Sequence, residues 1–165
     1  MHKPYGAGFL ALAEKPVVIC LFMWYNQLKI CFAVNLMNRN KLINYISDAY
    51  GTDADYPFLQ YPDVAVFRHV NNQKWFAVVM NVQKSKLGIK GDGAVDILNL
   101  KCNPILAGSL RSEMGFYPAY HMSKTNWISA ALDGSADDDK IKWLIDISFE
   151  LTAKKIKKRK GNEDV

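Results

Sequence analysis

Cysteine is scarce in this sequence, with only three residues among 165, and they lie far apart. Cys20, Cys31 and Cys102 form no C-x-x-C pair and show no metal-ligand spacing. A sparse, odd set of cysteines excludes the disulfide framework that holds many small secreted domains together. We therefore expect reduced thiols in a cytoplasmic protein. Cys102 should be buried and inert at the end of an apolar strand.

Catalytic and cofactor motifs are also missing. The Gly-rich segment 88–93 matches neither the G-x-x-x-x-G-K-[ST] phosphate loop nor the dinucleotide pattern G-x-G-x-x-G. Nothing pairs His69 or His121 with a nucleophile or a carboxylate in a defined role. The three aspartates at 137–139 are explained as charges at the start of a helix rather than as a cation site. We expect no enzyme activity, no metal and no cofactor.

A long apolar run is lacking as well, although nine consecutive residues at 17–25 are apolar. A membrane-spanning helix needs roughly 20 such residues, and polar residues within 26–29 interrupt this stretch. No small-residue cleavage site of a secretory signal closes the run. Residues 1–36 are therefore a doubtful extension. The favoured interpretation is that the functional chain begins at Met37; the alternatives are a weak membrane anchor or an extra packed element. No membrane contact is expected for residues 37–165.

The net charge of +5 is concentrated at the C-terminus. From Thr152 onward six basic residues face only Glu163 and Asp164, which gives +4 and leaves +1 for residues 1–151. A basic tail favours nucleic acid or an anionic surface. It also complements the negative end of a helix dipole, which is the alternative explanation. We treat residues 154–165 as a basic C-terminal tail.

What the sequence does contain is a strong strand pattern between residues 64 and 102. Two apolar runs, 64–69 and 74–80, flank an Asn-rich connection at 70–73, which is typical of a β-hairpin. Asn suits such a turn because it tolerates the left-handed backbone conformation. A third run, 94–101, follows the glycines of segment 88–93.

Three segments carry helix signals. Asn38 or Asn40 caps the first, which shows apolar residues at helical spacing and stops at Gly51. Asn103 followed by a proline begins a second, short helix. The third begins at the aspartates 137–139 and repeats apolar residues at steps of three and four.

Two further apolar runs separate the second and third helices. Residues 116–122 are typical of an edge strand, because Pro118 cannot take part in a central ladder. Residues 127–132 fit either a helix or a strand when their own pattern alone is considered. The order is thus helix, three strands, helix, two strands and a closing helix.

Several phrases of the sequence resemble the MmcQ/YjbR family. The first half contributes Tyr-Gly-Thr (50–52), Tyr-Pro (56–57), Val-Phe-Arg-His (66–69), Lys-Trp-Phe-Ala (74–77) and Asp-Ile-Leu-Asn-Leu-Lys-Cys (96–102). The second half contributes Pro-Ala-Tyr-His-Met (118–122), Lys124, Asn-Trp-Ile (126–128) and Leu-Asp-Gly-Ser (132–135). The similarity runs from about residue 38 to residue 152.

The resemblance implies a fold and a function. It implies an α+β domain over residues 37–153, with two layers in the order α-β3-α-β2-α and helices packed on one antiparallel sheet, a layout shared with secretion chaperones. It also implies a strand for residues 127–132. The family is described as DNA-binding through hairpins that act as paired wings. A protein-interaction or peptide-binding module is the alternative, since fold does not fix function.

The candidate contacts with nucleic acid are basic residues close to the predicted turns. They are Arg68, Lys74, Lys84, Lys86, Lys90, Lys101, Arg111 and Lys124. Solvated loop charge explains them equally well. Convergence of these residues on one face would favour nucleic acid, and an exposed apolar patch there would favour a protein partner. Trp75, Trp127 and the aromatic residues of 52–63 are expected to serve the core.

The chemistry of these residues predicts the kind of binding. Lysine on a loop brings charge to phosphates, whereas base readout usually needs arginine or amide side chains placed in the major groove. We therefore expect weak, sequence-tolerant and salt-dependent binding. The family resemblance implies that DNA is favoured over RNA.

Overall fold

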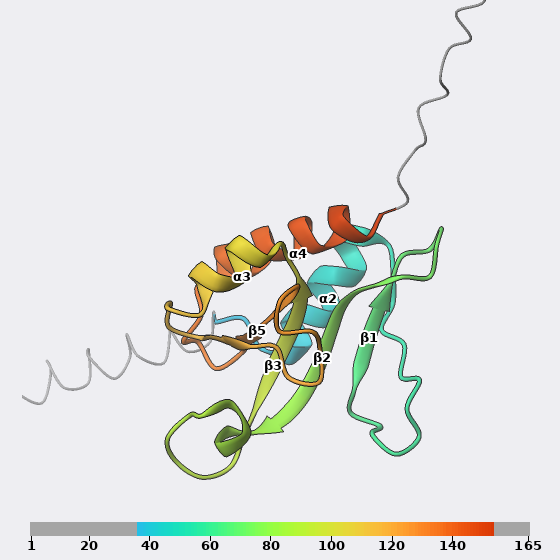
Figure 1. Ribbon diagram of the computed structural model, residues 1–165. Helices are drawn as coiled ribbons and strands as arrows, with labels where there is room; N and C mark the ends of the chain where they lie inside the picture. The colour runs from blue at the N-terminus through green and yellow to red at the C-terminus, as the bar shows by residue number, and fades with distance from the viewer. Residues whose placement is uncertain (1–35, 154–165) are drawn as a thin grey trace, which may run out of the picture. The chain divides into compact units, whose positions relative to one another are not determined.

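The computed structural model describes residues 36–153, so the expectations for residues 1–35 and for the tail 154–165 lie outside this range. The chain divides into two compact units between Leu36 and Met37, and the second unit contains the described helices and strands. In that unit three helices pack on one face of a five-stranded antiparallel sheet (Figure 1). The predicted α+β fold is therefore confirmed, including a strand at the ambiguous run 127–132.

The helices begin where the predicted caps are. The side chain of Asn38 accepts a hydrogen bond from the backbone N–H of Lys41 at the start of α2 (Arg39–Tyr50). Asn103 does the same for Leu106 in α3 (Pro104–Leu110), and Asp137 for Lys140 in α4 (Asp138–Thr152). Each cap satisfies a backbone donor that the first helical turn leaves without a partner.

The sheet has the strand order β1-β2-β3-β5-β4, and every neighbouring pair is antiparallel. The strands are β1 (Ala65–Arg68), β2 (Trp75–Gln83), β3 (Ala94–Lys101), β4 (Phe116–Pro118) and β5 (Trp127–Ala131). β4 is an edge strand, as Pro118 predicts. It ends at Pro118 rather than at residue 122, because side chains of β3 and β5 bind the backbone of Tyr120 instead. A short 3-10 helix, η1 (Lys84–Leu87), was not predicted.

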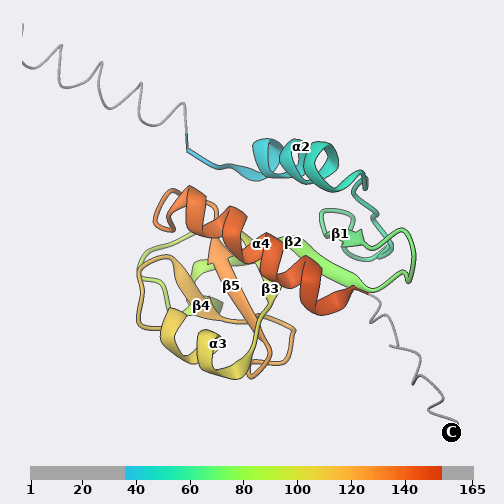
Figure 2. The ribbon, with the colours of Figure 1, turned by 90° about the horizontal axis from the view of Figure 1, so that it is seen from above.

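The two faces of the sheet are covered differently. On the helix face, Leu98 and Leu100 of β3 pack with Leu42, Leu144 and other fully buried residues of the helices. Figure 2 shows α4 lying across the strands between α2 and α3. On the other face, which we call the open face, Val78, Met80 and Ile97 form a smaller cluster, against which partly buried residues such as Phe58 and Tyr120 pack.

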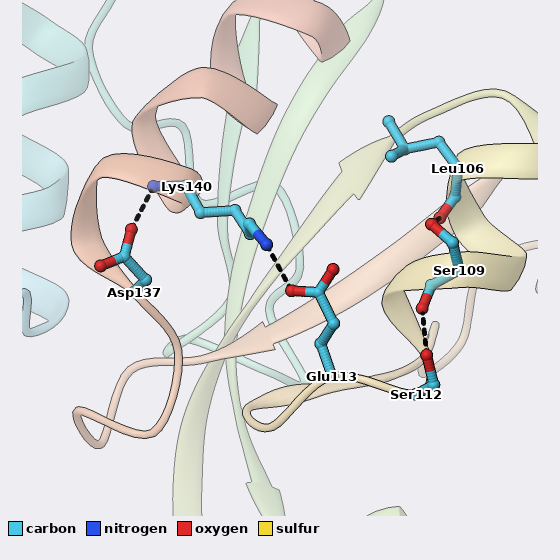
Figure 3. A network of polar contacts seen from close by, with 6 residues as sticks. All are labelled: Leu106, Ser109, Ser112, Glu113, Asp137 and Lys140. Carbon is cyan, nitrogen blue, oxygen red and sulfur yellow. Dashed lines mark hydrogen bonds and ion pairs between the residues drawn. The ribbon is translucent and has the colours of Figure 1, made fainter.

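Polar contacts fasten α4 to its neighbours. The buried Ser148 hydroxyl donates to the carbonyl oxygen of Phe76 in β2 and accepts from the Lys101 N–H of β3 at 2.8 Å. At the other end of the helix, Lys140 forms an ion pair with Glu113, which follows α3 (Figure 3). These contacts fix α4 on the sheet near both of its ends.

Candidate nucleic-acid interface

Five of the eight predicted basic residues lie at one end of the sheet, which we call the turn end. They are Arg68, Lys74, Lys101, Arg111 and Lys124. Arg68 is opposite Trp75 at the β1–β2 turn, and Lys101 is opposite Trp127 at the end of β3. The Arg111 guanidinium donates to the carbonyl oxygen of Lys124 in the β4–β5 connection. Antiparallel pairing thus brings together residues that are up to 56 positions apart in the sequence.

The other three predicted residues lie at the opposite end of β2. Lys84 and Lys86 belong to η1, and Lys90 follows in the same β2–β3 loop. β2 has nine residues, which at about 3.3 Å per residue separates the two ends by roughly 30 Å. Figure 1 shows this loop projecting from the end of the sheet that is remote from the β1–β2 turn. The eight candidates therefore form two groups and do not converge on one surface.

The two arginines of the turn end already have partners. Arg68 Nε lies 2.9 Å from Asp55 Oδ2, and its guanidinium lies 5.2 Å from the centre of the Trp75 ring. Arg111 is bound to the Lys124 carbonyl. The ammonium groups of Lys74, Lys101 and Lys124 show no ion pair or hydrogen bond within residues 36–153. The three lysines are thus the charges of the turn end that are available to an anionic ligand.

The C-terminal end of α4 also reaches the turn end. Asn72 Nδ2, in the β1–β2 turn, donates to the Thr152 carbonyl oxygen at 2.9 Å. His69 Nε2 lies 2.8 Å from Thr152 Oγ1 and 2.9 Å from the Phe149 carbonyl oxygen. The described chain ends at Ala153, and in the sequence the basic run of residues 154–160 follows directly.

The open face carries a cavity of about 480 Å³ that the sequence did not predict. Aromatic and methionine side chains supply most of its lining. The lining residues are Phe58, Tyr61, Val64, Trp75, Val78, Met80, Asn81, Tyr120, His121 and Met122. Tyr61 and His121 are exposed, whereas Trp75 is half-buried.

The family to which this fold and these residues belong follows from comparison with known proteins. The YjbR family model matches residues 47–151, which is more than half of the chain. The chain belongs to the YjbR family. It is 42% identical over 117 residues to the YyaQ protein of Bacillus subtilis (strain 168), covering 71% of this chain and 99% of that protein. It is 37% identical over 54 residues to the YjbR protein of Escherichia coli (strain K12), 32% of this chain and 46% of that one.

Solved structures carry the same YjbR fold. A crystal structure of a Pseudomonas syringae protein aligns with a TM-score of 0.70 and 47% identity, covering 71% of this chain and all of that one. A Deinococcus radiodurans protein aligns with a TM-score of 0.54 over 73% of this chain and 81% of its own, at 21% identity, which bears on the fold alone. None of these proteins has a name that states an activity, so the function of the YjbR domain has to be inferred from its geometry.

His69 and Cys102 of the YjbR domain are both buried. His69 is buried between α4 and β2, where its ring contacts Phe149 at 4.0 Å between centroids. Burial raises the pKa of the Cys102 thiol, and the Arg111 charge opposes that shift. Cys102 is thus the buried thiol that was predicted. Residues 36–153 contain no group of three histidine, cysteine or acidic side chains that could hold a metal ion.

One finding concerns membranes. Within residues 36–153 no helix has the length and apolar character that a membrane span requires.

Sequence reasoning missed the cavity because its walls come from three separate segments, 58–64, 75–81 and 120–122. Phe58 and Tyr61 were expected to cover the core, and Trp75 to anchor it. Phe58 does pack on the open-face cluster, at 5.9 Å from Trp75, but Tyr61 is 64% exposed. The signal in the sequence was the density of aromatic residues at 56–61, followed much later by the Tyr120-His121 pair.

Proposed function

We propose that this YjbR protein binds nucleic acid, with DNA favoured over RNA, through the phosphate backbone at the turn end of its sheet. The observation that carries the proposal is the grouping of Lys74, Lys101 and Lys124 at one end of the domain, without carboxylate partners among the described residues. Lysines on turns displace the counterions that are condensed on phosphates, which favours binding. On the basis of its few cysteines we further propose that the protein works in the cytosol.

The chemistry of the turn end favours binding to the backbone rather than base-specific readout of a duplex. Lysine ammonium groups act as point charges, and the two arginines that could read guanine are engaged with Asp55 and with the Lys124 carbonyl. Binding should therefore be weak and tolerant of sequence.

A titration of a fluorescent 20-base-pair random duplex, followed by anisotropy at several salt concentrations, tests the proposal. If four or five phosphates are neutralised, log affinity falls against log salt with a slope of roughly −4 to −5. No binding even at low salt would contradict the proposal. It would favour the alternative that the protein recognises a protein partner.

We also propose that the protein has no hydrolytic or redox activity of its own. His69 Nε2 contacts the Thr152 hydroxyl of α4, and the Cys102 thiol is buried with a raised pKa, which disfavours the reactive thiolate. Assays with generic ester, phosphoester and disulfide substrates should show no turnover. An activity that is lost in His121→Ala or Cys102→Ala, while the variant stays folded by circular dichroism, would overturn this statement.

A further inference from the structure

We propose that the cavity on the open face receives a single unpaired base of the bound nucleic acid. This inference rests on the proposed function and makes it more specific. It assigns a preference for single-stranded or locally opened nucleic acid over an intact duplex. Its support comes from the lining of the cavity, from the rigidity of its walls and from the charge around it.

The lining suits a flat ring. Rings of Phe58, Trp75, Tyr120 and His121 line the cavity, and Met80 and Met122 add polarisable sulfur. A volume of about 480 Å³ falls in the range of small-molecule sites and exceeds what one base needs. Every base has a π face, so stacking on aromatic side chains binds bases without strong sequence preference.

Two buried polar side chains hold the wall formed by Tyr120 and His121 in place. The fully buried Asn99 Nδ2 donates to the Tyr120 carbonyl oxygen at 3.0 Å. The fully buried Ser129 Oγ accepts from the Tyr120 N–H at 3.1 Å and donates to Asn99 Oδ1. Two polar side chains on the apolar open face thus hold both backbone groups of one residue.

His121 has the backbone conformation that this arrangement imposes. Its φ of 57° lies in the left-handed region, which is unusual for a residue other than glycine. The imidazole contacts the Tyr120 ring at 4.1 Å between centroids, in an edge-to-face arrangement. Residues other than glycine in this region store local strain, and such residues cluster at binding and active sites.

The charge around the cavity selects the occupant. None of the ten lining residues is acidic, so the lining holds no carboxylate that would repel a phosphate. Arg68 lies over the Trp75 ring, and Lys124 lies two residues beyond Met122 in the same connection. By strand alternation Lys101 points to the open face together with Ile97. A base within a nucleotide chain is a flat ring with a negative phosphate close by. It therefore matches both the aromatic lining of the cavity and the positive charge around it.

Binding of a fluorescent ten-nucleotide thymine strand and of a 20-base-pair duplex to the full chain tests the proposal. We expect the substitutions Tyr61→Ala and His121→Gly, combined, to weaken single-strand binding about tenfold. Both residues are exposed, and glycine accepts the left-handed backbone at 121, so the fold should be kept. The salt slope should not change, because no phosphate contact is removed. Leu59→Ala is the matched control, since Leu59 is fully exposed in the same segment as Tyr61 and does not line the cavity.

A second measurement uses ligands without phosphate. Thymidine and adenosine should shift the NMR signals of the Trp75 indole and of the Tyr120 and His121 amides. If Tyr61→Ala with His121→Gly leaves single-strand affinity unchanged while the duplex still binds, the base site is overturned and the phosphate interface stands. If the wild type binds neither oligonucleotide at low salt, the proposed function fails. Shifts that a hydrophobic peptide produces and nucleosides do not would overturn the base site in favour of a protein side chain.

Discussion

At the scale of single residues, Tyr50 shows how α2 and α4 are joined. Its ring packs against Phe76 and Phe149, with centroids 5.6 and 4.8 Å away, and its hydroxyl donates to Asp146. Burial raises the pKa of the Tyr50 hydroxyl, and the hydrogen bond and charge of Asp146 raise it further. The phenol is therefore held in its protonated form in the folded state more firmly than in the unfolded chain.

The pH dependence of stability follows from that difference. Stability that depends on the protonated Tyr50 is fully present below the pKa of the unfolded chain, about 10, and is lost as the pH rises above it. Tyr50→Phe keeps the ring and removes the hydroxyl, so it should lower the free energy of unfolding by about 1 kcal/mol at pH 7. Urea unfolding at pH 7 and pH 10.5 should show this gap between wild type and variant shrinking. A gap that stays constant or widens would contradict the assignment.

At the residue scale the caps could be predicted and the cavity could not. Asn38, Asn103 and Asp137 act on backbone groups only three positions away, so the sequence around them contains the whole interaction. The clamp on Tyr120 joins residues that are 9 and 21 positions away. Such contacts depend on the register of β3 and β5, which no local pattern specifies.

At the scale of elements, the corner between α3 and β4 depends on a close approach of two chain segments. Gly115 has a φ of 83°, and its carbonyl oxygen accepts from the Ala131 N–H of β5 at 2.8 Å. A Cβ atom added here would lie 2.3 Å from the backbone nitrogen of Ala136, in the segment before α4. Both the backbone conformation and the packing therefore demand glycine.

Two alanine substitutions separate this requirement from a general effect of replacing glycine. Gly115→Ala should lower the free energy of unfolding by about 3 kcal/mol or more, from left-handed strain plus overpacking. Gly108→Ala is the control, because Gly108 lies in α3 and an added Cβ would contact nothing within 4 Å. Alanine there should stabilise by about 0.5–1 kcal/mol. Equal effects of the two changes in urea unfolding would contradict this account of the corner.

The elements themselves were largely predictable, and their functional arrangement was not. The order of helices and strands followed from apolar periodicity except at residues 127–132, where the family resemblance indicated the strand, and Pro118 placed β4 at an edge. The alternation of strand residues, however, does not say which turns meet at one end of a sheet. Only the strand register shows that Lys74, Lys101 and Lys124 share one end of the sheet. It also shows that the lysines of the β2–β3 loop lie at the other end.

At the scale of the whole molecule, residues 37–153 should fold without the rest of the chain. Met37 is buried, its N–H donates to Asp138 Oδ2 at 2.9 Å, and the core of the helix face lies within this range. The truncated chain should be soluble and melt in one cooperative transition, as followed by circular dichroism. A molten or insoluble truncated chain, with a folded full-length protein, would show that the removed residues contribute to the core.

The most direct test of the central claim compares the two basic groups of the full-length protein in one salt titration. Replacing Lys74, Lys101 and Lys124 by alanine removes three charges from the turn end. Replacing Lys84, Lys86 and Lys90 by alanine removes three charges from the opposite end of β2 and is the matched control. The anisotropy of a labelled duplex gives the slope of log affinity against log salt for each protein.

We predict that the turn-end variant loses up to about 3 units of slope, if each lysine meets a phosphate. Its affinity at low salt should fall at least about tenfold. The control variant should keep most of the slope and of the affinity. Equal slopes for the wild type and the turn-end variant, or a larger loss in the control, would contradict the assignment of the turn end as the nucleic-acid interface.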